Sequence, residues 1–258
     1  MPVYKRKKPL INVEIRRRGI YLLPNLFTTA ALFAGFYSIV QAMNARFEQA
    51  AVAIFVAMVL DGLDGRVARL THTQSAFGAE YDSLSDMVSF GAAPALVMYE
   101  WALKSMDRIG WIAAFVYCAG TALRLARFNT NLAVVDKRYF QGLPSPAAAA
   151  LVAGFIWVVD DFKIEAVGTM RWIACIITLF AGLTMVSNIP FYSFKDLNFR
   201  KSVPFIALFF FLLVFVLLTS APAKVLFAIF LSYSFSGYLL WFWRRWKARH
   251  EEGEKHEG

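Results

Sequence analysis

Four aspartates, Asp61, Asp64, Asp82 and Asp86, lie within 26 residues of a largely apolar sequence. Residues three or four apart share a face of a helix, so each successive pair is expected on one face. The polar segment Leu70–Phe77 predicts a turn between two antiparallel helices that would point all four carboxylates at one place. A carboxylate near a bilayer costs about 2.5–3.5 kcal/mol or more unless it has a partner. Oxygen ligands favour Mg²⁺ or Mn²⁺, so we expect two divalent cations about 3.5–4 Å apart, an arrangement used in phosphoryl chemistry.

Small residues and one arginine accompany the aspartates. Gly65 and Gly78 leave room for a ligand or a facing backbone, and Ala68 is small as well. Arg69 follows Gly65 by one turn, and its guanidinium group can bind phosphate through two parallel hydrogen bonds. The set indicates a metal site for a phosphate-bearing ligand. Any one aspartate alone could be a helix cap, and a proton or cation pathway is an open alternative because intramembrane carboxylates mark those too.

The composition places these residues in a membrane protein. Apolar residues make up 59% of the 258 residues and charged residues 17%, whereas soluble proteins have about 45–50% and about 25%. A soluble globule of this size could not bury so much apolar surface, and a disordered chain would be polar. Cys118 and Cys175 are too few for a disulfide scaffold and are interpreted as small membrane-helix residues. The net charge of +9 suits an anionic membrane surface, so no nucleic acid is expected as a partner.

Eight apolar stretches are each about long enough to cross roughly 30 Å of hydrocarbon. They run over residues 22–43, 47–68, 84–103, 109–128, 143–159, 171–190, 203–219 and 223–243. Most Lys and Arg residues fall in the termini and in alternate connectors, which the positive-inside rule places in the cytoplasm. We therefore predict an all-α polytopic membrane protein with about eight transmembrane helices, both termini in the cytoplasm, and the aspartates on that side.

The aspartate segment resembles the signature of the CDP-alcohol phosphotransferase family. That signature reads D-x-x-D-G-x-x-A-R, then eight residues, then G-x-x-x-D-x-x-x-D, and every fixed position matches between Asp61 and Asp86. Residues 23–28 are similar to the family's first-span opening. Ser83 and Met87 stand where the glycerophosphate-transferring branch tends to have Pro and Lys. Four further segments resemble the bacterial phosphatidylserine synthases of the family, at 81–95, 124–129, 142–148 and 186–195.

The resemblance implies a reaction in which the hydroxyl of L-serine attacks CDP-diacylglycerol, giving phosphatidylserine and CMP. It implies that the four aspartates ligate Mg²⁺ or Mn²⁺ and that Asp86 is the general base. Gly65, Ala68, Arg69 and Gly78 would line the nucleotide pocket. It further implies a homodimer in the bacterial inner membrane, with the active site facing the cytoplasm.

The resemblance also suggests how the chain is divided. A basic arm or interfacial amphipathic helix (1–21) would precede a six-span catalytic core (22–190). A two-span C-terminal extension (191–243) and a charged cytoplasmic tail (244–258) would follow.

Five residues are weaker site candidates. Arg124 and Arg127 would bind the serine carboxylate or a lipid phosphate, or serve as positive-inside anchors. Asn25 and Thr28 would contact the nucleotide or cap the first span. Ser145, between two prolines, would shape the serine pocket or begin a helix.

Two other functions stay open at this point. Inositol phosphate or glycerol 3-phosphate would be the acceptor if the two arginines bind a phosphorylated alcohol. A cation or proton transporter would need ionisable groups along a path through the membrane midplane. The aspartates gather on one side, and we expect no matching acidic series on the other side, which disfavours a transporter. A non-catalytic scaffold would not need four aligned carboxylates.

Overall fold

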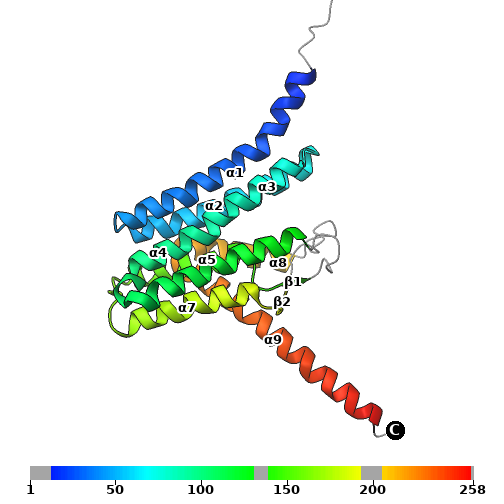
Figure 1. Cartoon of the computed structure of the whole chain (residues 1–258). Coiled ribbons are helices and arrows are strands. Elements are labelled where there is room, and N and C mark those ends of the chain that lie inside the picture. The colour runs from blue at the N-terminus through cyan, green and yellow to red at the C-terminus, as the bar shows by residue number, and fades with distance from the viewer. Residues whose placement is uncertain (1–12, 131–138, 193–204, 257–258) are drawn as a thin grey trace, which may run out of the picture.

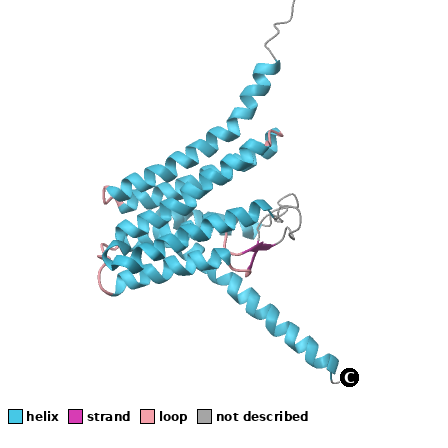
Figure 2. Ribbon diagram, in the orientation of Figure 1, coloured by secondary structure: helices cyan, strands magenta, loops and turns pink. Residues whose placement is uncertain are grey.

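The computed structural model describes residues 13–130, 139–192 and 205–256, and helices make up nearly all of this part of the chain (Figure 2). Figure 1 shows the helices side by side, with α9 leaving the bundle at an angle. The helices in chain order are α1 (Val13–Met43), α2 (Phe47–Thr71), α3 (Ala76–Asp86), η1 (Met87–Ala92), α4 (Ala93–Trp101), η2 (Leu103–Met106), α5 (Asp107–Thr130), α6 (Ser145–Asp161), α7 (Thr169–Val186), α8 (Phe205–Ser220) and α9 (Pro222–His256).

Each of the eight expected apolar stretches overlaps a helical segment of the structure, although 171–190 extends past the end of α7 into β2 (Pro190–Tyr192) and 203–204 lie outside the described residues. By length and composition, four described helices can cross a membrane: Leu23–Met43, Leu103–Thr130, Thr169–Val186 and Pro222–Lys247. Of the other four stretches, α2 carries several charges, α6 and α8 are short, and the third stretch is divided into α3, η1 and α4. The protein is an all-α polytopic membrane protein, as predicted; the exact number of spans and the side of the termini stay predictions.

Helices α1 and α2 form a hairpin whose contact surface consists of small residues. Ala50, Ala51 and Ala57 are fully buried on α2, and the Ser38 hydroxyl donates to the Ala50 carbonyl oxygen at 2.7 Å. Lipid is as apolar as a helix surface, so helices in a membrane associate through close packing and hydrogen bonds rather than through the hydrophobic effect. These small residues therefore hold the first half of α2 closely against α1.

Helices α5 and α7 approach each other more closely than side chains would allow. A Cβ atom at Gly182 would lie 2.8 Å from the Cα atom of Tyr117, and one at Gly120 would lie 2.6 Å from the Gly182 carbonyl oxygen. Glycine on both helices makes this contact possible. Helix α6 packs against α2, α7 and α9, and its buried residues between Ser145 and Val159 are all apolar. The core of the bundle is thus built mainly from alanine and glycine.

The third expected span is interrupted directly after Asp86. The six residues of η1 adopt the wider π-helical turn, a feature that often occurs at functional sites. Pro94 has no N–H group to donate to the Phe90 carbonyl oxygen, and the Tyr117 hydroxyl donates to that oxygen instead, at 3.0 Å. Ser89 donates to the Ala31 carbonyl oxygen at 3.1 Å. Helices α5 and α1 thus hold the interrupted segment, and with it the position of Asp86.

A two-stranded ribbon, which the sequence did not predict, joins two connectors. Strands β1 (Tyr139–Gln141) and β2 (Pro190–Tyr192) pair antiparallel, with Phe140 opposite Phe191. The ribbon lies beside the ends of α5 and α7 in Figure 1. It fixes the connector that leads into α6 relative to the connector that leaves α7.

The expected domain boundaries can be placed only in part. Helix α1 already begins at Val13, so residues 13–21 of the expected N-terminal arm continue into the first span; residues 1–12 lie outside the described part. Helix α9 runs through His256 and includes most of the expected tail. The expected boundary at residues 190–191 falls within β2. The division into a six-span core and a two-span extension therefore stays a prediction.

Candidate active site

Three of the four aspartates converge between α2 and α3. Asp61, Asp64 and Asp82 each offer a carboxylate oxygen, and these oxygens all lie within 4.8 Å of one another. The local sequence explains the convergence, because α2 ends at His72 in the left-handed conformation (φ 53°). Helix α3 then begins after Ser75, whose hydroxyl oxygen accepts a hydrogen bond from the Gly78 backbone N–H at 3.0 Å. The polar turn predicted from the sequence is therefore present; it reverses the chain after α2, and α3 packs against α1.

Asp86 lies at the margin of this cluster. Its carboxylate interacts electrostatically with those of Asp61 and Asp82 and with the guanidinium group of Arg124. It does not belong to the group of three that lies within 4.8 Å. Asp86 therefore adjoins the cluster through Asp61 and is within electrostatic reach of the Arg124 guanidinium group.

The cluster has the chemistry of a divalent cation site. Oδ1 of Asp82 is buried and has no hydrogen-bond partner among the residues that the structure describes. Asp64 is only 5% exposed, and its Oδ2 lies 2.7 Å from the hydroxyl of Thr28, which donates to it. One buried and two half-buried carboxylates with so few donors lack compensation, and an all-oxygen ligand set suits Mg²⁺ or Mn²⁺. Thr28, expected to contact the nucleotide or cap the first span, is a partner of Asp64 in the structure.

The other nucleotide candidates lie around the same turn. A Cβ atom at Gly65 would lie 3.5 Å from Nη1 of Arg69, so the guanidinium group folds back over the glycine. A Cβ atom at Gly78 would lie 3.5 Å from Oδ1 of Asn25, which brings α1 to the start of α3. Ala68 is half-buried, and its carbonyl oxygen accepts from the Thr73 N–H at 3.1 Å within the turn. A cavity of about 320 Å³ adjoins this turn, and its lining residues are Arg69, His72 and Gln74.

Two residues far apart in the sequence form a pair beside Asp86. Arg124 donates to the hydroxyl oxygen of Ser145 at 2.8 Å, and Ser145 is fully buried at the start of α6. The Nε atom of Arg124 is buried and has no hydrogen-bond partner in the described ranges 13–130, 139–192 and 205–256. The pair therefore presents an unsatisfied donor next to Asp86, and both members were candidates from the sequence.

Arg127 has a different set of partners. Its guanidinium group donates to the carbonyl oxygens of Val186 and Ser187 and to Oδ1 of Asn188, the last at 3.0 Å. Cations near the C-terminal end of a helix stabilise its unpaired carbonyl groups. Arg127 therefore binds the end of α7 in this structure, and of the two arginines Arg124 is the one that interacts electrostatically with Asp86.

The sequence did not assign roles to several polar residues that connect the site. Asn129 donates through Nδ2 to the Ser83 hydroxyl oxygen at 3.0 Å and so joins α5 to α3. Tyr81 and Thr29 share a hydrogen bond of 2.9 Å between α3 and α1. Ser83, Asn129 and Asn188 all fall within the segments that resemble the serine-transferring branch. Their position in these segments could have marked them as site candidates, but only the structure shows which residues they contact.

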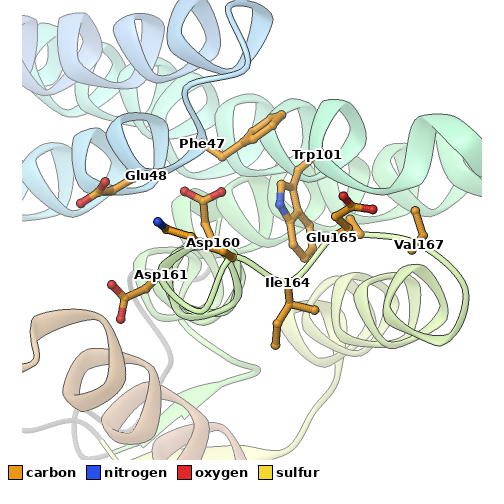
Figure 3. A pocket seen from close by; sticks show the side chains of 10 residues that line it. Phe47, Glu48, Trp101, Asp160, Asp161, Ile164, Glu165 and Val167 are labelled. Carbon is orange, nitrogen blue, oxygen red and sulfur yellow. The ribbon is translucent and has the colours of Figure 1, made fainter.

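The opposite end of the bundle carries an acidic cavity of about 700 Å³ (Figure 3). The expectation of no acidic series on that side is wrong, because four acids and one lysine line it: Glu48, Asp160, Asp161, Glu165 and Lys163. Helices α2 and α6 both connect the two ends. Between the cavity and the aspartate end, neither helix carries an ionisable residue: none occurs from residue 49 to 60 on α2 or from 146 to 159 on α6. These helices therefore provide no ionisable path from the cavity to the aspartates.

Comparison with known proteins identifies the family of this chain. The family model described as CDP-alcohol phosphatidyltransferase matches residues 21–186, a range that includes all four aspartates. A Helicobacter pylori protein is 40% identical over 197 residues, which cover 76% of this chain and 83% of that protein. It bears the name CDP-diacylglycerol–serine O-phosphatidyltransferase. A relative of the same name in Mycobacterium leprae is 37% identical, and the match covers 68% of this chain and 59% of that protein. One in Saccharomyces cerevisiae is 35% identical, and the match covers 69% of this chain and 61% of that protein. The chain therefore belongs to the CDP-alcohol phosphatidyltransferase family.

Proposed function

We propose that this enzyme transfers the phosphatidyl group of CDP-diacylglycerol to the hydroxyl of L-serine and releases CMP. The observation that carries this proposal is the cluster of Asp61, Asp64 and Asp82 within the range that the family model matches. The names of the relatives support serine as the acceptor. The serine hydroxyl oxygen would form the new bond to the lipid-linked phosphorus, while the bond from that phosphorus to CMP breaks.

Asp61, Asp64 and Asp82 would hold divalent cations, with Asp86 as a further ligand at the margin of the cluster. The orphaned Oδ1 of Asp82 supports this role, because it is a buried acceptor without a donor in the described residues. Bound Mg²⁺ or Mn²⁺ would neutralise the diphosphate and the charge that develops on the leaving CMP. Thr28 would orient Asp64, since a hydrogen bond to a ligating carboxylate fixes its direction.

Asp86 would accept the proton of the serine hydroxyl as the transfer proceeds. A general base must come within hydrogen-bond reach of the proton that it takes, so the acceptor must be oriented beside it. Arg124 supports this arrangement, because a guanidinium group can bind the serine carboxylate with two hydrogen bonds. Its unpartnered Nε and the neighbouring Ser145 hydroxyl would supply these contacts.

The nucleotide would bind around the α2–α3 turn. Gly65 and Gly78 lack side chains where the diphosphate must approach the backbone, and Ala68 adds little bulk. Arg69 at the mouth of the turn would bind a phosphate, and Asn25 beside Gly78 would add a polar contact. Arg127 would contribute indirectly by holding the end of α7 in place.

The active site would face the cytoplasm of a bacterial inner membrane. The basic residues of alternate connectors support this orientation through the positive-inside rule. The location suits the substrates, because one is a lipid and the other is water-soluble. A homodimer is part of the proposal through the family resemblance alone.

The test is CMP release by the purified chain in detergent with CDP-diacylglycerol and Mn²⁺ or Mg²⁺. L-serine, glycerol 3-phosphate and inositol phosphate are supplied in parallel as acceptors. We expect turnover with serine and none with the two phosphorylated acceptors. Turnover with a phosphorylated acceptor would retain the family chemistry and reject serine. No CMP release with any acceptor, from folded protein, would reject the proposed reaction.

A further inference from the structure

Helix α1 packs against both of the helices that carry the aspartates. It forms a hairpin with α2, which bears Asp61 and Asp64, and it also contacts α3, which bears Asp82 and Asp86 (Figure 1). Helix α1 contributes no aspartate of its own. The position of the two aspartate pairs relative to each other therefore depends on how each helix is fixed to α1.

Thr28 of α1 makes a hydrogen bond to each of these two helices. Its hydroxyl donates to Oδ2 of Asp64 on α2 at 2.7 Å, and its backbone carbonyl oxygen accepts from the hydroxyl of Ser85 on α3 at 3.1 Å. Thr28 and Ser85 are both almost fully buried, so these bonds lie away from solvent. Thr28 thus connects a carboxylate of α2 to the residue that directly precedes Asp86 on α3.

One turn further along the chain, a second buried serine donates to α1 in the same way. The Ser89 hydroxyl in η1 donates to the Ala31 carbonyl oxygen at 3.1 Å. A Cβ atom at Gly35 would lie 2.5 Å from Oγ of Ser89, so only glycine at that position admits Ser89 so close to α1. Thr28, Ala31 and Gly35 are three and four residues apart and therefore share one face of α1. That face receives both serines.

Ser85 stands between the two aspartates of α3 in the sequence. It follows Asp82 by three residues and directly precedes Asp86. A hydrogen bond depends on both distance and angle, so α3 cannot slide or rotate on α1 at this level without losing the bond. The Asp82 carboxylate lies within 4.8 Å of those of Asp61 and Asp64 on α2. Mg²⁺ accepts only a narrow range of ligand distances, so a small displacement of α3 would impair a site shared by the two helices.

We propose that Ser85 is a positioning residue of the active site, whose hydrogen bond to the Thr28 carbonyl oxygen holds the aspartates of α3 at the distance from those of α2 that a divalent cation requires. This inference rests on the proposed function of the aspartates as metal ligands. Ser85 itself touches neither cation nor substrate, because its hydroxyl is directed at α1. Thr28 serves the site twice, since its hydroxyl orients Asp64 and its carbonyl oxygen receives Ser85.

The test replaces Ser85 by alanine, which removes only the hydroxyl. Mn²⁺ binding is followed by electron paramagnetic resonance in the absence of substrate, and steady-state CMP release is measured with varied L-serine at saturating Mn²⁺. We expect the Kd for Mn²⁺ to rise about fivefold, less than the loss of about 10–100-fold that is typical for a direct partner of a ligand. We expect kcat to fall about tenfold and the KM for serine to change less than about threefold, because displaced catalytic groups slow the reaction more than they weaken acceptor binding.

Ser38→Ala is the matched control. Ser38 is likewise a buried serine, and its hydroxyl joins α1 to α2 through a bond to the Ala50 carbonyl oxygen, away from the aspartates. Both alanine variants should lower the melting temperature by similar amounts, since each loses one buried hydrogen bond between helices. Only Ser85→Ala should weaken Mn²⁺ binding. Ser85→Cys, which has a similar size and a weaker donor, should also raise the Kd and replaces the alanine variant if that protein does not fold.

The outcomes separate this inference from the proposed function. An unchanged Kd for Mn²⁺ in Ser85→Ala, or an equal rise in Ser38→Ala, would overturn the role of Ser85 and leave the proposed function intact. A wild-type chain that binds no Mn²⁺ would overturn the role of the aspartates as ligands and this inference with it. A wild-type chain that binds Mn²⁺ but transfers nothing to serine would overturn the proposed function, and the Kd values of the variants would still decide the role of Ser85.

Discussion

The hydroxyl of Thr28 lies 2.7 Å from Oδ2 of Asp64, although the two residues are 36 positions apart and stand on different helices. Both side chains are almost fully buried. Helix α1 therefore supplies a donor to a carboxylate of the proposed metal site, and the α1–α2 packing and the ligand geometry depend on each other.

Replacement of Thr28 by valine should weaken metal binding. The substitution keeps the shape of the side chain and removes the donor, and loss of such a partner typically costs about 10–100-fold in metal affinity. We expect the Mn²⁺ concentration for half-maximal CMP release to rise about tenfold, with a matching loss of Mn²⁺ binding followed by electron paramagnetic resonance. Thr28→Ser, which retains the hydroxyl, should stay near wild type. Equal Mn²⁺ affinity in the valine variant would show that the hydrogen bond has no role in the site.

Replacement of Asp86 by asparagine should abolish turnover and preserve binding of CDP-diacylglycerol. Asparagine has nearly the same shape but cannot take a proton, so the loss of a general base should reduce kcat by about 10²–10⁴-fold. Binding is measured by displacement of a labelled CDP nucleotide. Asp161→Asn, at the far end of the bundle, is the control and should retain full activity. Wild-type turnover in Asp86→Asn would remove this residue as the base.

Removal of divalent cations should stop the reaction reversibly and lower the stability of the fold. EDTA is expected to abolish CMP release, and added Mg²⁺ or Mn²⁺ should restore it. Cations that bind only the folded state also raise the melting temperature, so Mn²⁺ should stabilise the wild type more than Asp82→Asn. The melting temperature gives a readout that is independent of turnover. Activity that is indifferent to EDTA would rule out metal assistance.

Much of this arrangement follows from local sequence. The positions and lengths of the apolar stretches predict where the helices lie. The three- and four-residue spacings of the aspartates predict which of them share a helix face. The polar turn predicts the antiparallel course of α2 and α3, which brings Asp61, Asp64 and Asp82 together. These features depend on residues within a few turns of one another, so a sequence pattern can carry them.

The features that the sequence did not predict depend on partners far along the chain. The π-helical turn after Asp86 is held by Tyr117 on α5 and by the Ala31 carbonyl oxygen on α1. The separate roles of Arg124 and Arg127 depend on Ser145 and on the end of α7, so two arginines on one face of a helix reach different targets. The acidic cavity at the opposite end gathers side chains from separate segments. No local pattern specifies which of these segments meet.

Asp160 in that cavity provides a test of stability against pH. Burial raises the pKa of the Asp160 carboxyl, and the nearby charge of Glu48 raises it further. A raised pKa in the folded state means that the fold favours the protonated form, so stability falls as pH rises from the unfolded pKa through the folded one. Asp160→Asn removes the charge and should raise the melting temperature at pH 7. The gain should disappear below about pH 4, where the carboxyl is protonated in both states. A variant that melts below wild type at pH 7 would contradict this account.

Two glycines, Gly182 at the contact between α5 and α7 and Gly62 on the surface of α2, should respond oppositely to replacement by alanine. A Cβ atom at Gly182 would meet the backbone of Tyr117 at 2.8 Å, so one helix must move and the close packing is lost. We expect Gly182→Ala to destabilise the fold by about 1–3 kcal/mol, the usual cost of overpacking. Gly62 on α2 has nothing within 4 Å of its Cβ position, and alanine there should be neutral or stabilising by up to about 1 kcal/mol because it favours the helix. Unfolding in mixed micelles of increasing denaturing detergent measures both variants. Equal stability of Gly182→Ala and wild type would mean that α5 and α7 are not held together by this contact.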